Sequence, residues 1–412
     1  MRLKGFQKLT SIEDALQLFF ANLRIGKLET VIVPLHSALN RILAEDVIAK
    51  EDLPRFDRSA VDGYAIRAEN TFEASQFKPK NLQTISEDEI NDRQAKQLWT
   101  GNPLPKGANA IVMLENTRRI NGEIEVWTPV TPGENVSKKG EDIAKGEIAI
   151  KSGTRLKPQH LGLVAALGIP EIKVFERPRI AILATGSELV NLREKLQEGQ
   201  IFEANRLVVS ALCHELSAEP IDLGIAKDDV NEILESLKIG IEKADAIITT
   251  GGTSVGASDL VPEAINKIGK PGVIVHGIAM RPAMPTALAV VNGKPVIILA
   301  GNPVAAMIGF EVFARPLIFR LSGLKQEEHR PLIRAKTTKR ISTTLGRKTF
   351  VRVSVFKRDE EFFAEPISAR GSGMISTMTR ANGYVIVPEN REGLDNGETV
   401  SVHLFNSVEG AD

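Results

Sequence analysis

The stretch that decides the fold is AIITTGGTSVGASD, which runs from Ala246 to Asp259. Its first five residues are apolar or β-branched, and this pattern predicts a buried parallel strand. The loop after the strand can bind an anion, because glycines let backbone N–H groups approach it while hydroxyl and carboxylate groups contact a phosphate or its metal. The candidate binding residues are Gly251, Gly252, Thr253, Ser254, Gly256 and Asp259. Taken alone, the stretch also fits a plain loop that caps a helix.

The composition is that of a soluble protein with several domains. The chain has 412 residues, more than one hydrophobic core usually serves, so two to four domains are expected. Lys plus Arg and Asp plus Glu both number 52, so no overall charge attracts nucleic acid or an anionic membrane. The amino terminus lacks a secretion signal, and no segment approaches the ~20 apolar residues that cross a bilayer. We therefore expect a cytoplasmic protein with neither nucleic-acid nor membrane partners.

Residues 179–325 alternate strands with helices, which is typical of a parallel sheet covered on both faces. Strands are expected at 180–184, 220–224, 246–250, 273–275, 287–291 and 296–299, and helices at 204–216, 230–241, 260–268 and 304–321. The Asn292-Gly293 turn adds one antiparallel hairpin. The pattern predicts a doubly wound, three-layer α/β domain at the centre of a multidomain α/β plus β protein. The single cysteine, Cys213, is expected to be a buried thiol in one of the helices.

Residues 1–53 and 143–178 share short helices and strands, and they are expected to form one discontinuous N-terminal domain. Ser11 can cap an amphipathic helix, and a second short helix is predicted from Ser37 to Ala44. A third helix is predicted from Pro158 to Leu167, because a proline at the start and a glycine just after the end are typical helix boundaries.

Two further segments contain mainly short strands. Residues 54–142 are predicted to be a β-rich insert domain, with strands separated by Gly and Pro turns and an Asn121-Gly122 hairpin. Residues 326–412 form the C-terminal β domain, for which we expect a small barrel or sandwich. Its strands are predicted at 332–335, 349–355, 361–364, 383–387 and 399–404.

Carboxylates follow glycines at three strand ends of the predicted α/β sheet. They are Glu188 after Gly186, Asp228 and Asp229 after Gly224, and Asp259 after Gly251 and Gly252. Because strand ends of a doubly wound sheet converge on one crevice, we expect Glu188, Asp228 and Asp259 to lie together. Oxygen ligands beside glycine loops suit Mg²⁺, which keeps phosphate partners. Each carboxylate considered singly also fits a helix cap or a first-turn acid.

Other loops combine polar residues in ways that are unusual for a linker. In the insert, the stretches 55–65, 100–107 and 133–142 carry charges beside Gly, Pro or aromatic residues, although solvated loops explain each as well. A fourth strand end enters a helix through Gly301, Asn302 and Pro303. Asn302 is expected at the helix cap, and a ligand could occupy the same helix N-terminus.

Together these stretches resemble the MoeA family, the molybdopterin molybdenumtransferases that also form the C-terminal part of gephyrin. The resemblance extends over nearly the whole chain. The motifs that carry it are FDRSAVDGYA at 56–65, TG at 100–101, GED at 140–142, TGSE at 185–188, the loop at 251–259 and GNPV at 301–304, all in the family's order and spacing.

The resemblance implies an elongated subunit of four parts that dimerises through the discontinuous N-terminal domain, so that the partner chain completes each active cleft. It also implies the reaction, in which adenylated molybdopterin and molybdate, or tungstate, give the molybdenum cofactor and AMP. Molybdoenzymes or other cofactor-biosynthesis proteins would then receive the cofactor. The matching functional positions are Asp62, Thr100, Asp142, Glu188, Asp228, Asp259, Arg281, Arg352 and Ser372.

Each matching position has an implied role. Glu188, Asp228 and Asp259 would bind Mg²⁺ and the adenylate phosphates, while Arg281 and Arg352 would attract the oxyanion. Asp62, Thr100 and Asp142 would come from the insert of the partner chain.

The chain departs from the family in its lysine-rich loop, which here reads GIAMRPAMP at 277–285. Gly277 and Arg281 stand where lysines are expected, and Ala283-Met284 replaces a Gly-Lys pair. Ser137 replaces a common arginine, and Ala300 a common proline. These departures leave fewer cations at the expected anion site.

Three functions remain open from the sequence. The first is metal insertion with release of AMP, and the second is a non-catalytic scaffold that holds molybdopterin without turnover, which the missing lysines favour. The third is a nucleotide pyrophosphatase, because the domain at 179–325 alone resembles domains of such enzymes.

Overall fold

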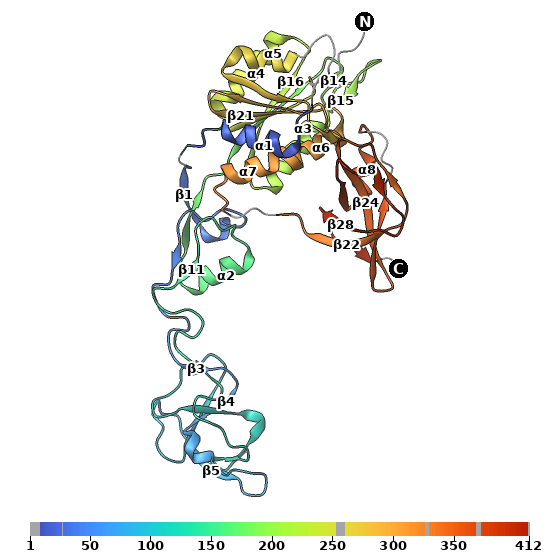
Figure 1. Cartoon of the computed structure of the whole chain (residues 1–412). Helices are drawn as coiled ribbons and strands as arrows, with labels where there is room; N and C mark the ends of the chain where they lie inside the picture. Colours follow the sequence, from blue (N-terminus) through green and yellow to red (C-terminus); the bar gives the residue numbers. More distant parts are fainter. Residues whose placement is uncertain (1–8, 27, 253–259, 326–328, 368–371, 411–412) are drawn as a thin grey trace. The chain divides into compact units, whose positions relative to one another are not determined.

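The computed structural model describes residues 9–26, 28–252, 260–325, 329–367 and 372–410. The chain forms two compact units (Figure 1). The first unit comprises the described parts of Met1–Val31, Asn40–Ile42 and Phe175–Asp412, and the second comprises Ile32–Leu39 and Leu43–Val174. β1 (Thr30–Pro34) and β12 (Glu171–Phe175) lie where the chain passes from one unit to the other. No helix within the described ranges is long and apolar enough to span a membrane.

The first unit is built on a sheet in which six described strands have the order β16-β13-β17-β21-β20-β18. Their bounds are Glu219–Ala226, Arg179–Thr185, Ala246–Thr250, Lys294–Leu299, Ala287–Val291 and Pro271–His276, in that order. The first four strands are parallel, and β20 pairs antiparallel with both β21 and β18. The predicted hairpin is confirmed, because Val291 pairs with Lys294 across Asn292-Gly293. All six predicted strands are therefore present.

Helices cover both faces of this sheet. Alternate β13 residues enter different cores: Ile180 and Ile182 pack with α1, α3, α6 and α7, whereas Ala181 and Leu183 pack with α4 and α5. The helices are α1 (Ile12–Ala21), α3 (Asn205–Glu215), α4 (Val230–Lys243), α5 (Leu260–Ile268), α6 (Pro303–Gly309) and α7 (Arg315–Leu321). β14 (Leu189–Val190) and β15 (Ile201–Phe202) form a separate two-stranded sheet. The three-layer, doubly wound prediction is confirmed.

Two helices have environments that bear on the predictions. Ser11 accepts a hydrogen bond from the backbone of Asp14 and caps α1 as predicted. α1 packs on the α/β sheet through Ile12 and Phe19, whereas the sequence grouped it with residues 143–178. Cys213 of α3 is buried, and this burial raises the pKa of its thiol to about 12.

The last predicted helix is interrupted. Between α6 and α7 the segment Phe310–Ala314 is π-helical. Pro316 lies in the first turn of α7 and has no N–H to donate to the carbonyl of Val312. A π-helical turn rearranges the backbone hydrogen bonds around this proline, so the single helix predicted over 304–321 becomes two α-helices and an intervening turn.

The C-terminal segment forms a closed five-stranded barrel in the order β24-β25-β22-β28-β26, with β26 pairing back to β24. The strands are β22 (Leu332–Thr337), β24 (Lys348–Arg358), β25 (Glu361–Pro366), β26 (Gly383–Val387) and β28 (Thr399–Leu404). The strand β19 (Met280–Arg281) comes from the α/β domain and pairs in parallel with β24. Smaller elements are β23 (Ile341–Ser342), β27 (Gly393–Leu394), β29 (Glu409–Gly410) and α8 (Ser376–Thr379). The five predicted strands are confirmed, and of the two expected forms, barrel or sandwich, they form the barrel.

The second unit contains a sheet with the order β7-β4-β6-β5-β9-β8. Its strands are β4 (Gly63–Ile66), β5 (Lys80–Thr84), β6 (Gln94–Leu98), β7 (Ala110–Met113), β8 (Thr117–Ile120) and β9 (Glu123–Val126). The Asn121-Gly122 hairpin joins β8 to β9 as predicted. A separate pair, β3 (Arg58–Ser59) and β10 (Val136–Ser137), connects two of the predicted site loops. Short 3-10 turns occupy Ala68–Thr71 and Leu114–Asn116.

Two distant segments of the second unit fold together. β2 (Val47–Ile48) pairs with β11 (Ile148–Ile150), and Leu53 bridges Ile143. The helix α2 (Pro158–Ala166) begins at the predicted proline. The helix predicted from Ser37 to Ala44 is wrong.

In place of that helix, a short 3-10 turn, Leu35–Ser37, is followed by Asn40 with a φ of 62°. Leu43 then forms a β-bridge to Val174. Ile42 and Leu43 are buried here, beside the strand that contains Val174, whereas Leu39 is exposed.

Candidate active site

The order of the α/β sheet places a topological switch point at the carboxyl ends of β13 and β17. From β13 the sheet continues to β16 on one side and to β17 on the other. The helix after β13, α3, covers one face, and the helix after β17, α5, covers the opposite face. Open α/β sheets bind ligands at such a switch point. The two strands end at Thr185 and Thr250.

Glycines allow these strand ends to approach one another closely. Gly251 has a φ of +93°, and a Cβ added there would lie 2.4 Å from the carbonyl oxygen of Thr185. Its N–H donates to the carbonyl of Leu299 at the end of β21, with an N···O distance of 3.0 Å. A Cβ added at Gly301 would lie 3.6 Å from the Cα of Gly251. The predicted glycines of two loops, Gly251 and Gly301, are thus brought together.

Hydroxyl groups at the same edge have no described partner. The Oγ1 atoms of Thr185, Thr249 and Thr250 are buried and form no hydrogen bond with any residue that the structure describes. Buried polar atoms are almost always hydrogen-bonded in folded proteins. The arrangement therefore suits a ligand with polar atoms at this edge of the sheet.

Two of the three predicted metal ligands lie on loops that are bonded to each other. The N–H of Ser187 donates to Oδ2 of Asp228 at 3.1 Å, and the N–H of Asp228 donates to Oγ of Ser187 at 3.1 Å. The Glu188 carboxylate folds over Gly186, where an added Cβ would lie 2.7 Å from Oε2. Both carboxylates are exposed to solvent. Exposed oxygen ligands on adjoining loops suit a hard cation.

The remaining predicted residues of this loop, Thr253, Ser254, Gly256 and Asp259, lie outside the described residues. Within the described ranges, no group of three His, Cys, Asp or Glu side chains could hold a metal ion. A three-carboxylate site at the carboxyl ends of β13 and β17 therefore stays a prediction that requires Asp259.

Two neighbouring predictions need correction. Gly224 was expected at a strand end, but β16 continues past it to Ala226, and its φ of +84° accompanies a register irregularity in the sheet. Asp229 caps α4 by accepting hydrogen bonds from the backbone of Asn231 and Glu232. The cap interpretation therefore holds for Asp229, while Asp228 faces the loop of Ser187.

A cationic cavity of about 340 Å³ lies where the α/β domain meets the C-terminal barrel. Its described lining includes three arginines, Arg281, Arg347 and Arg352, and no carboxylate. Pairing of β19 with β24 places Arg281 opposite Thr349, within the stretch that carries Arg347 and Arg352. We call this space the oxyanion cavity, because guanidinium groups bind tetrahedral anions through several hydrogen bonds at once.

The three guanidinium groups differ in their surroundings. Arg352 is only 4% exposed, and this burial lowers the pKa of its guanidinium from the ordinary value. Arginine nevertheless stays charged in proteins. Arg281 is exposed and Arg347 half-buried, and no described carboxylate forms an ion pair with either of them. Their positive charge is therefore not neutralised by this part of the chain.

Polar residues from a third segment complete the oxyanion cavity. Asn302 occupies the cap position of α6, but its side chain makes no capping hydrogen bond and lines the cavity. The carbonyl of Ser372 accepts a hydrogen bond from Val304 in the first turn of α6, at 3.1 Å. The predicted residues Arg281, Arg352, Asn302 and Ser372 therefore line one space.

Arg281, Ala283, Met284 and Ala300, four of the residues that depart from the family pattern, lie in the lining of the oxyanion cavity. Ala283 and Met284 both face the cavity, where the resemblance implied a glycine and a lysine. Arg347 is an additional cation that sequence reasoning did not single out. Its only signal is the basic pair Arg347-Lys348 directly before a β-branched strand, which is too common to indicate a site. Ser187 was also missed, although it joins the two acidic loops.

In the second unit, Asp62 and Thr100 are in direct contact. The backbone N–H and the hydroxyl of Thr100 both donate to Oδ1 of Asp62, at 2.7 and 2.8 Å. These two hydrogen bonds, the backbone one above all, lower the pKa of the Asp62 carboxyl below its ordinary value. Asp62 is consequently an ionised, exposed and oriented carboxylate at neutral pH.

The three predicted loops of the insert are joined by hydrogen bonds. Ser59 exchanges backbone hydrogen bonds with the loop of Gly101, and Asp57 accepts one from Lys139 in the loop of Asp142, at 2.8 Å. Asp142 is exposed, and its N–H donates to Leu53. The loops that carry the residues predicted at 62, 100 and 142 are thus joined, and Asp62 and Thr100 are in direct contact.

Known proteins match this architecture throughout. The MoeA N-terminal region (domains I and II) matches residues 10–168, a probable molybdopterin binding domain matches 181–320, and the MoeA C-terminal region (domain IV) matches 334–405. A Methanocaldococcus jannaschii protein whose name assigns it to molybdopterin biosynthesis is 37% identical over 98% of both chains. This chain belongs to the MoeA family.

Further relatives support the assignment. The molybdopterin molybdenumtransferase of Bacillus subtilis is 35% identical and aligns over 93% of this chain and 92% of its own. A crystal structure of the molybdopterin biosynthesis MoeA protein from Pyrococcus horikoshii superposes with a TM-score of 0.83 at 32% identity, over 97% of this chain and 100% of that one. The resemblance predicted from the sequence motifs is confirmed.

Proposed function

We propose that this chain is a molybdopterin molybdenumtransferase, which inserts molybdate into adenylated molybdopterin and releases AMP in molybdenum cofactor biosynthesis. The observation that carries the proposal is the continuity of two sites. Gly301 lies against Gly251 at the end of β17, and the next residue, Asn302, lines the oxyanion cavity. An adenylate bound at Gly251 would therefore lie beside an oxyanion bound by arginines. The names of the relatives support molybdenum transfer to molybdopterin.

The described residues suggest a division of roles. The backbone N–H groups from Gly252 onward would bind the adenylate phosphates, since the N–H of Gly251 already donates to Leu299 and glycine lets the backbone approach an anion closely. Glu188, Asp228 and Asp259 would hold Mg²⁺, which when bound neutralises phosphate charge. Arg281, Arg347 and Arg352 would bind molybdate or tungstate.

Adjacent aspartates give a matched test of these roles. Asp228→Asn removes a proposed metal ligand, so metal-dependent AMP release from adenylated molybdopterin and molybdate should fall by at least about 100-fold. Asp229→Asn is the control, because asparagine caps a helix as well as aspartate does and AMP release should stay near the wild-type rate. Equal rates for both variants would remove Asp228 from the site. Asp259→Ala should behave like Asp228→Asn.

We further propose a homodimer in which Asp62, Thr100 and Asp142 complete the active site of the partner chain. Asp62→Ala and Asp259→Ala should each be inactive alone, because every site then lacks one carboxylate. Co-refolding equal amounts should restore about a quarter of the wild-type AMP release, since half of the dimers are mixed and each has one complete site. If the mixture stays inactive while each variant alone is dimeric, the site is not shared.

A non-catalytic scaffold is the second candidate, and the presence of Ala283 and Met284 in the oxyanion cavity favours it. The same assay separates the two functions. Tight binding of adenylated molybdopterin without release of AMP would favour the scaffold, and turnover with either oxyanion would favour the enzyme. Comparing molybdate with tungstate in this assay also identifies the preferred oxyanion.

A further inference from the structure

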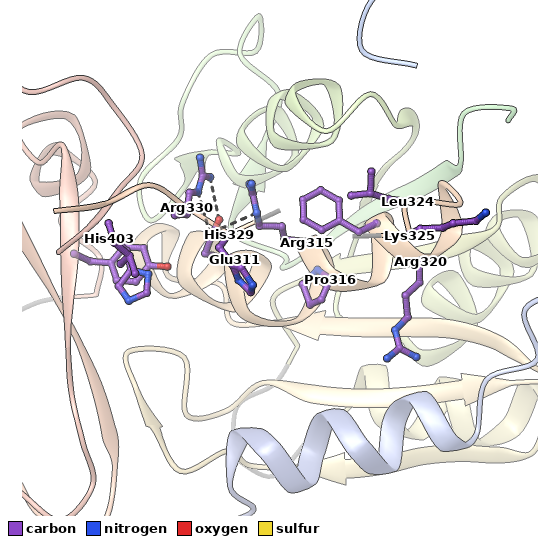
Figure 2. A pocket seen from close by; sticks show the side chains of 12 residues that line it. Glu311, Arg315, Pro316, Arg320, Leu324, Lys325, His329, Arg330 and His403 are labelled. Atoms are coloured by element: carbon purple, nitrogen blue, oxygen red, sulfur yellow. Dashed lines mark hydrogen bonds and ion pairs between the residues drawn. The ribbon is translucent and has the colours of Figure 1, made fainter. Parts of the chain in front are cut away.

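The insert leaves polar and aromatic groups open, which distinguishes it from a cavity of about 470 Å³ beside α7. In that cavity the central charges are paired with one another (Figure 2). Glu311 accepts two hydrogen bonds from Arg330, each at 3.0 Å, and its Oε1 lies 3.8 Å from Nε of Arg315. By contrast, the indole of Trp99 and one carboxylate oxygen of Asp62 have no partner in the described part of the chain.

Trp99 directly follows β6 and adjoins the contact between Asp62 and Thr100. Gly63 of β4 pairs with Leu98 of β6, so the next residues outward along the two strands are Asp62 and Trp99. Thr100, whose N–H and hydroxyl both donate to Asp62, is the residue after Trp99. None of the roles proposed above uses Trp99, although it adjoins two residues that have such roles.

Hydrogen bonds on both sides hold the backbone at Trp99. Its N–H donates to Oδ1 of Asn102 at 3.0 Å, and its carbonyl accepts from the N–H of Asn102 at 2.9 Å. The N–H of Gly101 donates to the carbonyl of Ser59 at 2.8 Å, which ties this turn to the loop that leads to Asp62. A fixed backbone therefore presents the indole, so binding a ligand to its face orders little of the chain.

The indole ring of Trp99 is open to a ligand. Its side chain belongs to a residue that is 55% exposed, and residues 28–252, which include the whole insert, are all described. Within the described ranges the ring stacks on no other ring, and its N–H donates to no residue. An exposed aromatic residue is ordinary by itself. This one is rigidly held and adjoins a fixed charge.

Asp62 supplies that charge and a free acceptor. Both donors of Thr100 reach Oδ1, whereas Oδ2 accepts a hydrogen bond from no residue that the structure describes. An ionised carboxylate oxygen binds N–H and amino donors more strongly than a neutral acceptor does. A flat aromatic face and a charged acceptor, carried by adjoining residues, suit a flat ring that bears an amino group.

We propose that Trp99 is a substrate-binding residue whose indole stacks on a flat, amino-bearing heterocycle of the substrate, beside the Asp62 carboxylate. The inference rests on the proposed function, because adenylated molybdopterin contains two such heterocycles, its adenine and its pterin. It deepens that function by giving the insert a contact with a ring of the substrate. Since Trp99 and Asp62 belong to the same insert, they serve the same site of the dimer.

Binding is measured apart from turnover by isothermal titration calorimetry of the full chain with adenylated molybdopterin and Mg²⁺, without molybdate or tungstate. Trp99→Leu should bind at least about fivefold more weakly, because stacking on an aromatic side chain is lost. Trp99→Phe should keep most of the affinity, because a flat aromatic face remains. Phe77→Leu is the control and should bind like the wild type, since it removes a 99% exposed aromatic residue elsewhere in the insert.

Kinetics separate a substrate contact from a structural role. In the AMP-release assay, Trp99→Leu should raise KM at least about fivefold and leave kcat within about twofold, because the stack is made equally in the ground state and the transition state. Displacement of Thr100 and Asp62 would lower kcat instead. Titration with AMP identifies the ring: weaker AMP binding in Trp99→Leu assigns the adenine, and unchanged AMP binding assigns the pterin.

Mixed dimers locate the contact. Trp99→Leu added to the Asp259→Ala chain should raise the KM of the mixed dimer, because that chain supplies Asp62 to the one complete site. Added to the Asp62→Ala chain, it should leave KM unchanged, because its own insert serves the inactive site.

Three results would overturn the inference. The first is unchanged affinity in a folded Trp99→Leu variant when the wild type binds, which leaves the proposed function standing. The second is a lowered kcat with an unchanged KM. The third is loss of the dimer in Trp99→Leu, which would place the indole in a subunit contact. Failure of the wild type to bind adenylated molybdopterin would remove the proposed function as well.

Discussion

The Asp62 carboxylate shows how a single residue acquires a fixed charge. Two donors from Thr100 converge on one of its oxygens and lower its pKa. Because the folded-state pKa lies below the unfolded value, the resulting contribution to stability is complete above the unfolded pKa. It is lost as the pH falls through the folded pKa. The geometry of this loop thus keeps Asp62 ionised at neutral pH.

Replacing Thr100 with valine should raise the pKa of Asp62, because the hydroxyl donor is lost. The pKa should stay below the ordinary value, since the stronger backbone hydrogen bond remains. NMR titration of the labelled Asp62 carboxyl group measures this shift. Thr131→Val removes a similar hydroxyl–carboxylate contact, with Glu134, and should leave the pKa of Asp62 unchanged. An unaltered pKa in Thr100→Val would mean that the hydroxyl does not affect this charge.

At the scale of elements, the loop after β17 depends on close backbone packing against β13. Gly251→Ala would combine a strained φ of +93° with a Cβ 2.4 Å from the Thr185 carbonyl, which cannot move aside easily. Gly199→Ala is the matched control, because its φ is +83° and no atom lies within 4 Å of the added Cβ.

The φ strain alone should cost about 1–2 kcal/mol in both variants. The overlap should make Gly251→Ala less stable than Gly199→Ala by a further 1–3 kcal/mol or so. Urea unfolding measures both free energies. Equal losses would show that the strand ends relax without cost.

Elements with a strong local signal were predictable from the sequence. The six strands of the α/β sheet follow β-branched runs, and both Asn-Gly hairpins adopt the expected positive φ values. The helix predicted at Ser37–Ala44 was not correct, because pairing of Leu43 with Val174 overrides its local pattern. The π-helical segment was not predictable either, since no periodicity distinguishes it from an α-helix.

At the scale of the whole chain, Arg330 joins the α/β domain to the barrel. It pairs with Glu311 of the π-helical segment and with Glu215 of α3, and the side chains of Arg330 and Glu311 are only 13% and 14% exposed. Arg330→Met should lower the free energy of unfolding by about 3 kcal/mol, because Glu311 loses its main partner while largely buried.

A double-mutant cycle checks this result. Adding Glu311→Met to Arg330→Met should recover much of the lost stability, since no unpaired carboxylate then remains. Lys336→Met breaks an exposed pair with Glu361 and should cost less than about 1 kcal/mol. A loss in Arg330→Met no larger than in this control would show that the buried pair contributes little.

The candidate site was predictable to the extent that its residues follow strand ends. Glu188 and Asp228 are on adjoining loops, and Asp62 contacts Thr100, as their motifs suggested. The oxyanion cavity was harder to predict from the sequence, because Arg347 belongs to no motif and reaches the site only through the pairing of β19 with β24.

The short strand β19 has a consequence for any attempt to divide the chain. Its two residues belong to the α/β domain, yet they pair with the first residues of β24 in the barrel, and the backbone N–H of Lys348 also donates to the carbonyl of Ala279 at 2.9 Å. Proteolytic cleavage between Leu324 and Leu332 would therefore leave both fragments associated. In a barrel expressed by itself, the backbone groups of β24 that pair with β19 would be exposed. Exposed backbone groups of this kind can pair with another chain and promote aggregation.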